Sequence, residues 1–95
     1  MILTATVATT HGSRYLQQLC KHWSHKFETR FDAEQGVIAF PMGAIRMAAK
    51  PQALVVTLEP NADADVERFK QVVADHLDRF AFREAPLPFA WTQAA

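Results

Sequence analysis

The chain has 95 residues, of which 49% are hydrophobic and 21% charged, with ten basic residues balanced by ten acidic ones. This length fits a single domain over residues 1–95, and the apolar fraction supports a folded core rather than a disordered chain. A nucleic-acid-binding surface requires a basic excess, so the balanced charge argues against that function. A net charge near zero also removes a repulsive barrier to self-association, which favours a homodimer.

Cysteine use and apolar run length bear on the compartment. Cys20 is the single cysteine of the sequence, so no internal disulfide can form, as expected in a reducing compartment. No apolar run approaches the length of a membrane span, and no basic N-terminal segment precedes an apolar stretch. We therefore expect a cytoplasmic protein that has no membrane partner.

A strand and an amphipathic helix are the first elements expected along the chain. Residues 2–8 alternate apolar and polar side chains, as a half-buried strand does. A turn follows, and Ser13 is a candidate N-cap for a helix over residues 14–26. Five side chains of this helix share one stripe that is expected to face the core: Tyr15, Leu16, Leu19, Cys20 and Trp23.

Four short strands are expected in the middle of the chain. Alternating side chains predict them at residues 27–32, 37–40, 44–49 and 54–59. Turn-forming residues such as Gly36 and Gly43 separate them. Because the connections are only a few residues long, antiparallel pairing is favoured over parallel crossovers.

A second helix and an extended tail complete the chain. The helix opens after Pro60, with acidic side chains near its positive N-terminal end. It has the cleanest apolar stripe of the sequence: Val66, Phe69, Val72, Val73, Leu77 and Phe80. Pro86 and Pro88 hold the following segment extended, and its apolar side chains are expected to pack onto the body: Leu87, Phe89 and Trp91.

The predicted order is β-α-β-β-β-β-α followed by a tail. Each strand has one apolar face and each helix one apolar stripe, so the fold class is α+β, a curved antiparallel sheet with both helices on one face. The connectivity resembles half of a TATA-binding-protein-like fold, an analogy of topology alone. The uncovered face would collect polar and small side chains: Thr4, Thr6, Glu28, Arg30, Val37, Ala39, Arg46, Ala48, Val55, Thr57 and Glu59. Such a face can be solvated, or it can bind a partner or a second copy.

Two stretches make the sequence recognisable. They are Arg14-Tyr-Leu-Gln-Gln-Leu-Cys-Lys-His-Trp-Ser-His-Lys26 and His76-Leu-Asp-Arg-Phe-Ala-Phe-Arg-Glu84, the second continuing to Leu87 and Trp91. On these residues the chain resembles, over nearly its whole length, an uncharacterised bacterial family known as domain of unknown function 2218. The family has no assigned activity, so the resemblance implies no catalytic residue. Some similar domains are attached to siderophore-interacting, flavin-dependent reductases, which implies a link to iron acquisition and a partner of that type.

Three histidines form a candidate metal site. His22 and His25 are three residues apart on the first helix, which places their Cβ atoms about 5–6 Å apart. Two ligands are too few for zinc, so a third would have to come from His76 or His11. In the alternative interpretation, His25 is solvated, His22 borders the core, and His76 is a core residue satisfied by the Tyr15 hydroxyl, a carbonyl or the tail.

Charged residues around the end of the second helix form another candidate site. Arg79, Arg83 and Glu84 lie there, where cations complement the helix dipole. Together with Arg14 they could instead bind an anion or a carboxylate. Cys20 is expected to be an inert core thiol, because a reactive one needs exposure and a neighbouring positive charge.

No catalytic constellation stands out, so the preferred interpretation is a non-enzymatic binding or accessory domain without a cofactor. We expect it to be homodimeric and to serve iron or siderophore metabolism. Its candidate ligand-binding residues are Arg14, His22, His76, Arg79, Arg83 and Glu84. The alternative is a small metal-dependent or acid–base enzyme built on His22, His25 and His76.

Overall fold

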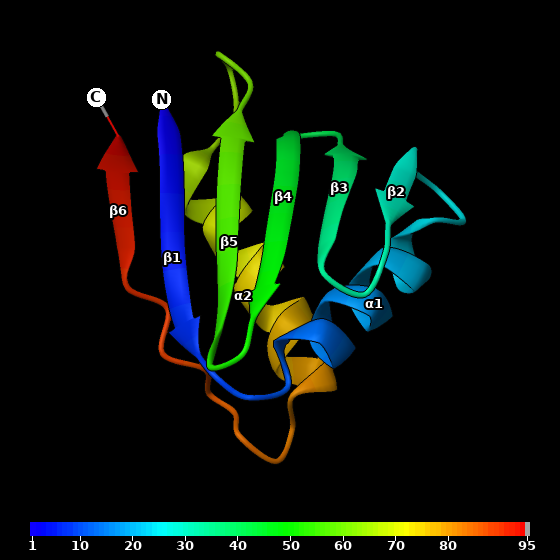
Figure 1. The fold of residues 1–95 in the computed structure, drawn as a ribbon. Coiled ribbons are helices and arrows are strands. Elements are labelled where there is room, and N and C mark those ends of the chain that lie inside the picture. The colour runs from blue at the N-terminus through cyan, green and yellow to red at the C-terminus, as the bar shows by residue number, and fades with distance from the viewer. Residues whose placement is uncertain (95) are drawn as a thin grey trace.

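The computed structural model describes residues 1–94 and has two helices packed on a six-stranded antiparallel sheet. The strands are β1 (Ile2–Ala8), β2 (Thr29–Phe31), β3 (Gln35–Phe40), β4 (Gly43–Lys50), β5 (Ala53–Pro60) and β6 (Trp91–Ala94), and the helices are α1 (Gly12–Trp23) and α2 (Val66–Phe80). The strand order is β2-β3-β4-β5-β1-β6. Both helices lie behind the same face of the sheet (Figure 1), so the predicted α+β class with its one-sided helical layer is confirmed.

The strands pair as the short connections predicted. The four strands from β2 to β5 are neighbours in the sheet in chain order. The first strand, β1, pairs antiparallel with β5, with Ala5 opposite Val56. Because side chains alternate between the two faces of a strand, one set from β1 and β5 is buried under the helices: Leu3, Ala5, Val7, Leu54, Val56 and Leu58.

Helix α1 has the predicted buried stripe but different ends. It begins at Gly12 and ends at Trp23, and its N-cap is His11, which makes no side-chain cap hydrogen bond. The expectation that Ser13 caps the helix is therefore wrong. The Ser13 hydroxyl instead donates to the Ala33 carbonyl oxygen at 2.5 Å, which ties the helix to the β2–β3 turn.

Helix α2 begins with a side-chain cap. The carboxylate of Asp65 accepts a hydrogen bond from the Arg68 backbone N–H at 3.1 Å, which satisfies one of the free N–H groups of the first turn. Phe69, Val73 and Leu77 of the predicted stripe are fully buried. This stripe fixes which face of α2 rests on the sheet.

The tail forms a strand that the sequence did not predict. Trp91 lies opposite Ala5 in an antiparallel pairing, which makes β6 the edge strand beside β1. Leu87 is buried, as expected, and its backbone N–H donates to the Asp78 carboxylate at 2.9 Å. The tail is therefore packed on the body as predicted, and it also extends the sheet by one strand.

Candidate functional site

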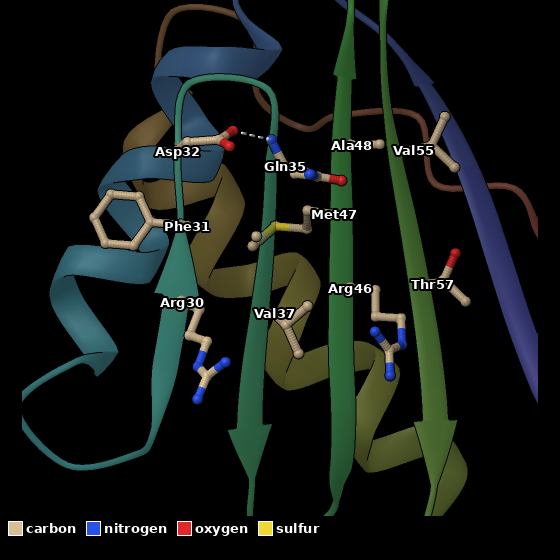
Figure 2. Close-up of a pocket in the computed structure, with 11 residues that line it drawn as sticks. Arg30, Phe31, Asp32, Gln35, Val37, Arg46, Met47, Ala48, Val55 and Thr57 are labelled. Atoms are coloured by element: carbon tan, nitrogen blue, oxygen red, sulfur yellow. Dashed lines mark hydrogen bonds between the residues drawn. The ribbon is translucent and has the colours of Figure 1, made fainter.

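The open face of the sheet has a hollow over β2, β3, β4 and β5 (Figure 2), with a volume of about 530 Å³. The side chains and backbone that line it come from these four strands and the β2–β3 turn: Arg30, Phe31, Asp32, Gln35, Gly36, Val37, Arg46, Met47, Ala48, Val55 and Thr57. Ten of these residues, all except Asp32, belong to consecutive strands of a hydrogen-bonded sheet that positions them rigidly.

One row of side chains across the sheet carries the charge of the hollow. By strand register Arg30 lies opposite Val37, Val37 opposite Arg46, and Arg46 opposite Thr57. Neighbouring strands are about 4.8 Å apart, so the two arginine backbones are separated by about 10 Å, with one strand between them. Figure 2 shows the two arginine side chains extending on either side of Val37. We name these four residues the arginine row.

Small side chains beside the arginine row create the depression. On one side, Gln35 lies opposite Ala48 and Ala48 opposite Val55. On the other side, Ala39 lies outside the lining, in a separate small depression with Glu28, Arg30 and Val37. Alanine and valine rise little above the sheet, whereas arginine is long, so the hollow has a low apolar floor and cationic walls.

The two arginines differ in their partners. The Arg46 Nε lies 2.6 Å from a carboxylate oxygen of Glu59, in a pair of which both side chains are exposed. The ion pairs found among residues 1–94 leave Arg30 without an acidic partner. Asp32, also in the lining, accepts backbone hydrogen bonds from Glu34 and Gln35 at 2.7 and 2.9 Å. These bonds hold the pKa of the Asp32 carboxyl below its usual range and fix the β2–β3 turn.

The two helices bring His22 and His76 together. Their ring centroids are 5.6 Å apart, and the His76 ring also lies 4.7 Å from the Trp23 ring. The Nδ1 atom of His76 is 2.8 Å from the Val72 carbonyl oxygen, a hydrogen bond in which the ring nitrogen is the donor. His76 is thus a partly buried residue satisfied by a carbonyl, one of the partners that the alternative interpretation named.

The third histidine of the predicted metal set does not join this pair. Among residues 1–94 no three His, Cys, Asp or Glu side chains lie close enough to hold a metal ion together. The structure therefore brings His22 and His76 together, and no third ligand joins them among the described residues. Burial lowers the pKa of His22, and the positive charges of His76, Arg79 and Lys26 act in the same direction, which favours the neutral imidazole.

Glu84 belongs to a cluster that the sequence did not predict. Its carboxylate accepts hydrogen bonds from the buried Tyr15 hydroxyl and from the Thr9 hydroxyl, the latter at 2.9 and 3.1 Å. The Thr9 oxygen also accepts from the His11 backbone N–H at 3.1 Å. Glu84 thus ties the end of α2 to the β1–α1 turn, and the Tyr15 hydroxyl is not the partner of His76.

The hydrogen bond between Tyr15 and Glu84 shifts the pKa values of both groups. Burial, followed by the hydrogen bond to Glu84, raises the pKa of the Tyr15 hydroxyl. The hydrogen bond from Tyr15 lowers the pKa of the Glu84 carboxyl. Both shifts favour a tyrosine that keeps its proton and a carboxylate that stays ionised.

The arginines predicted to join Glu84 have separate neighbours. The Arg79 charge acts on His22, and the Arg83 guanidinium lies over the Phe82 ring at 5.7 Å. The Arg14 charge lowers the pKa of Tyr15, which opposes the larger effects of burial and of Glu84. Among the described residues, the Glu84 carboxylate is hydrogen-bonded by the hydroxyl donors, and the nearby charge that acts on it is that of His11.

Cys20 is fully buried, and burial raises its pKa to about 11. The thiol therefore keeps its proton at neutral pH, as an inert core cysteine does. Its sulfur lies under β3, where a Cβ atom added to Gly36 would be only 2.8 Å away from it. Gly36 thus allows helix and sheet to approach closely beneath the hollow.

A second depression, also of about 530 Å³, runs between α2 and the tail. Its lining includes Lys70, whose ammonium group already lies 3.1 Å from the Glu67 carboxylate. The two depressions are similar in size, but only the open-face hollow presents an arginine without an acidic partner among the described residues. The open-face hollow is therefore the stronger candidate site.

An open six-stranded antiparallel sheet, covered on one face by two helices, defines the class of protein as an α+β domain. The model of DUF2218, a family described as an uncharacterized protein conserved in bacteria, matches residues 4–92. The chain belongs to this family, and the resemblance found in the sequence is confirmed.

A solved structure of similar fold is the NMR structure of PA4090 from Pseudomonas aeruginosa. It has a TM-score of 0.78 and 35% sequence identity, over 98% of this chain and 96% of that chain. No curated protein matches the chain. These relatives supply the fold and the family but no activity, so function has to be argued from the site.

Proposed function

We propose that the chain is a non-enzymatic binding domain that holds a small molecule in the hollow of the open sheet face. The observation that carries the proposal is the hollow itself: its volume of about 530 Å³ lies within the range of ligand pockets, roughly 300–1,000 Å³. An apolar floor with a few convergent polar groups is the usual composition of such pockets. The lining contains no histidine, cysteine, serine or lysine, and its one carboxylate, Asp32, accepts hydrogen bonds from the Glu34 and Gln35 backbone.

The link to iron and siderophore metabolism is the finer part of this proposal. Its support is the resemblance to domains attached to siderophore-interacting reductases, and a reductase of that type is the proposed protein partner. Ferric siderophore complexes therefore belong among the compounds to be tested. As for the predicted compartment, no helix among residues 1–94 has the length and apolar character needed to cross a membrane; the cytoplasmic location stays a prediction.

Ligand screening by NMR tests the proposal. A ¹⁵N-labelled sample is titrated with anionic, neutral and cationic small molecules, including ferric siderophores, and the amide shifts are mapped. We expect shifts that cluster on β2, β3, β4 and β5. The substitution Ala48→Phe should fill the hollow and abolish them, whereas Thr92→Phe, opposite Thr4 on the edge strand β6 and outside the lining, should not. If no compound of any charge class shifts these strands, the proposal is wrong.

The predicted homodimer can be tested with the same variants. A dimer formed through the open face would cover the hollow, so ligand and second copy would compete for it. Size-exclusion chromatography with light scattering should then show that Ala48→Phe or a bound compound changes the dimer fraction. A mass equal to that of the monomer at all concentrations would exclude the dimer.

The pair of histidines supports a second candidate function, an acid–base site, or a metal site in which water or a bound molecule supplies the ligands that two histidines cannot. A metal-binding histidine commonly donates its other ring N–H to a carbonyl, as His76 does to Val72. Native mass spectrometry with Fe(II), Zn(II) and Cu(II) should show stoichiometric uptake that His76→Ala abolishes and His25→Ala leaves intact. Absence of uptake would leave this candidate without a mechanism.

A further inference from the structure

We infer that the ligand of the hollow is a small organic carboxylate held between Arg30 and Arg46, an inference that rests on the proposed function. The register places the two arginines in one row with the short side chain of Val37 between them. Their backbones are about 10 Å apart, and arginine side chains are long and flexible enough to converge on a group above the middle strand. A carboxylate above Val37 would therefore meet a guanidinium on each side.

The partners of the two arginines leave both able to bind. Arg30 has no acidic partner among residues 1–94, so its guanidinium needs no exchange before it contacts an anion. Arg46 is paired with Glu59, but the two side chains are 54% and 38% exposed. Exposed pairs of this kind are weak and readily exchanged. Arg30 is thus the main anchor, and Arg46 the second donor.

The acidic residues around the hollow do not reverse its preference for an anion. Asp32 is in the lining, but its carboxylate is turned to the backbone N–H groups of Glu34 and Gln35. Glu59 is neutralised by Arg46, and Glu28 is an exposed residue that borders Arg30 in a small neighbouring depression. The lining contains two arginines and one acidic residue, Asp32; because Arg46 is paired with Glu59, Arg30 is the cation of the lining that no ion pair among the described residues offsets.

Two features of the hollow indicate an organic carboxylate rather than an inorganic ion. The guanidinium group is planar and binds a carboxylate or a phosphate with two parallel hydrogen bonds, so it selects an anion. The floor next to the arginine row is apolar, formed by Val37, Ala48 and Val55. A carboxylate with a flat apolar body would cover this floor while its charged end contacts the arginines.

A charge series on one apolar body tests the inference. Benzoate, benzyl alcohol and benzylamine are titrated into the ¹⁵N-labelled protein, with inorganic phosphate as an anion that lacks an apolar body. We expect benzoate to bind most tightly, and its shifts to map to β2, β3 and β4 around the arginine row. Arg30→Gln should weaken benzoate about tenfold, the loss of one hydrogen bond to a charged group, and leave benzyl alcohol unchanged. Arg14→Gln, an exposed arginine outside the hollow, is the matched control.

The outcomes separate this inference from the proposed function. Equal affinity for benzoate and benzyl alcohol, equal affinity for benzoate and phosphate, or an Arg30→Gln variant that binds benzoate normally would overturn the carboxylate assignment. If only neutral or cationic compounds of the wider screen bind at the hollow, the assignment falls and the binding domain remains. If nothing binds there, both fall. Because Arg30 is exposed, its variant should fold, and an unchanged Tm verifies this.

Discussion

The two faces of the sheet differ in whether their polar side chains have partners within the protein. On the helical side every buried side-chain nitrogen and oxygen among the described residues has a hydrogen-bond partner. Tyr15 is satisfied by Glu84, and His76 by the Val72 carbonyl. On the open side, Arg30 has no acidic partner, and Arg46 has an exposed one. The buried polar groups of the helical side are all hydrogen-bonded within the fold, whereas the open side has a guanidinium group that is available to a ligand.

The largest effect should come from truncating a core side chain on the helical side. Phe69 is fully buried between α2 and the sheet, and Phe69→Ala should lower the free energy of unfolding by about 3–5 kcal/mol. Val37→Ala on the open face should cost less than about 1 kcal/mol, because that side chain packs only against neighbouring strands. Urea denaturation measures both. Similar losses of unfolding free energy for the two variants would contradict the view that the helical face contributes more to stability than the open face.

The next effect concerns the contact between the sheet and α1 beneath the hollow. A methyl group at Gly36 would lie 2.8 Å from the Cys20 sulfur and 3.1 Å from the Phe31 Cβ. Gly36→Ala should therefore destabilise the fold by about 1–3 kcal/mol through overpacking.

The double variant with Cys20→Ala sharpens this prediction. Removing the sulfur makes room for the new methyl group, so part of the loss should be recovered, and the two substitutions should not be additive. Thermal denaturation of both single variants and the double variant measures the coupling. Strict additivity would show that the cysteine is not the group that excludes a side chain at position 36.

A smaller effect is expected at the Glu84 cluster. Tyr15→Phe removes one hydrogen bond to a charged group and should cost about 1.5 kcal/mol at neutral pH. The pKa of Glu84 is lower in the folded protein than in the unfolded chain, so the unfolded state binds more protons as the pH falls. The stabilisation is complete above the ordinary glutamate pKa and is lost as the pH falls through the lowered folded value.

Denaturation midpoints measured from neutral pH to below pH 4 test this dependence. The wild-type protein should lose stability over that range more steeply than Tyr15→Phe, whose carboxyl has lost its main donor. The two curves should therefore converge at acid pH. A constant difference between them would show that the hydroxyl stabilises the fold independently of the Glu84 charge.

The sequence predicted those features that depend on local periodicity. Alternation located the strands from β1 to β5, and the stripe from Phe69 to Leu77 oriented α2, because burial follows directly from spacing in each case. It missed β6, which is short and becomes a strand only because the edge of β1 is free to pair. The Ser13 cap was wrong because the Ser13 hydroxyl donates to the carbonyl oxygen of Ala33, a residue distant in sequence.

The candidate site could be predicted from the sequence only in part. The residues of the open face followed from alternation, including Arg30 and Arg46. Their alignment with Val37 depends on strand register, which alternation alone does not give. The bond between Tyr15 and Glu84 joins residues 69 positions apart, so no local pattern could indicate it. Local periodicity thus identified the face, and tertiary pairing created the site on it.

The smallest effect on stability should accompany the clearest effect on binding, at Glu59. Its pair with Arg46 is exposed, so Glu59→Gln should change the free energy of unfolding by no more than about 0.5 kcal/mol. The same substitution frees the Arg46 guanidinium and removes a negative charge next to the arginine row. Benzoate should therefore bind more tightly to Glu59→Gln than to the wild-type protein, whereas Glu34→Gln, an exposed acidic residue outside the lining, should have no effect. A variant that loses stability without a gain in affinity would mean that Glu59 serves the fold, and that the open face is no more available for binding than the helical one.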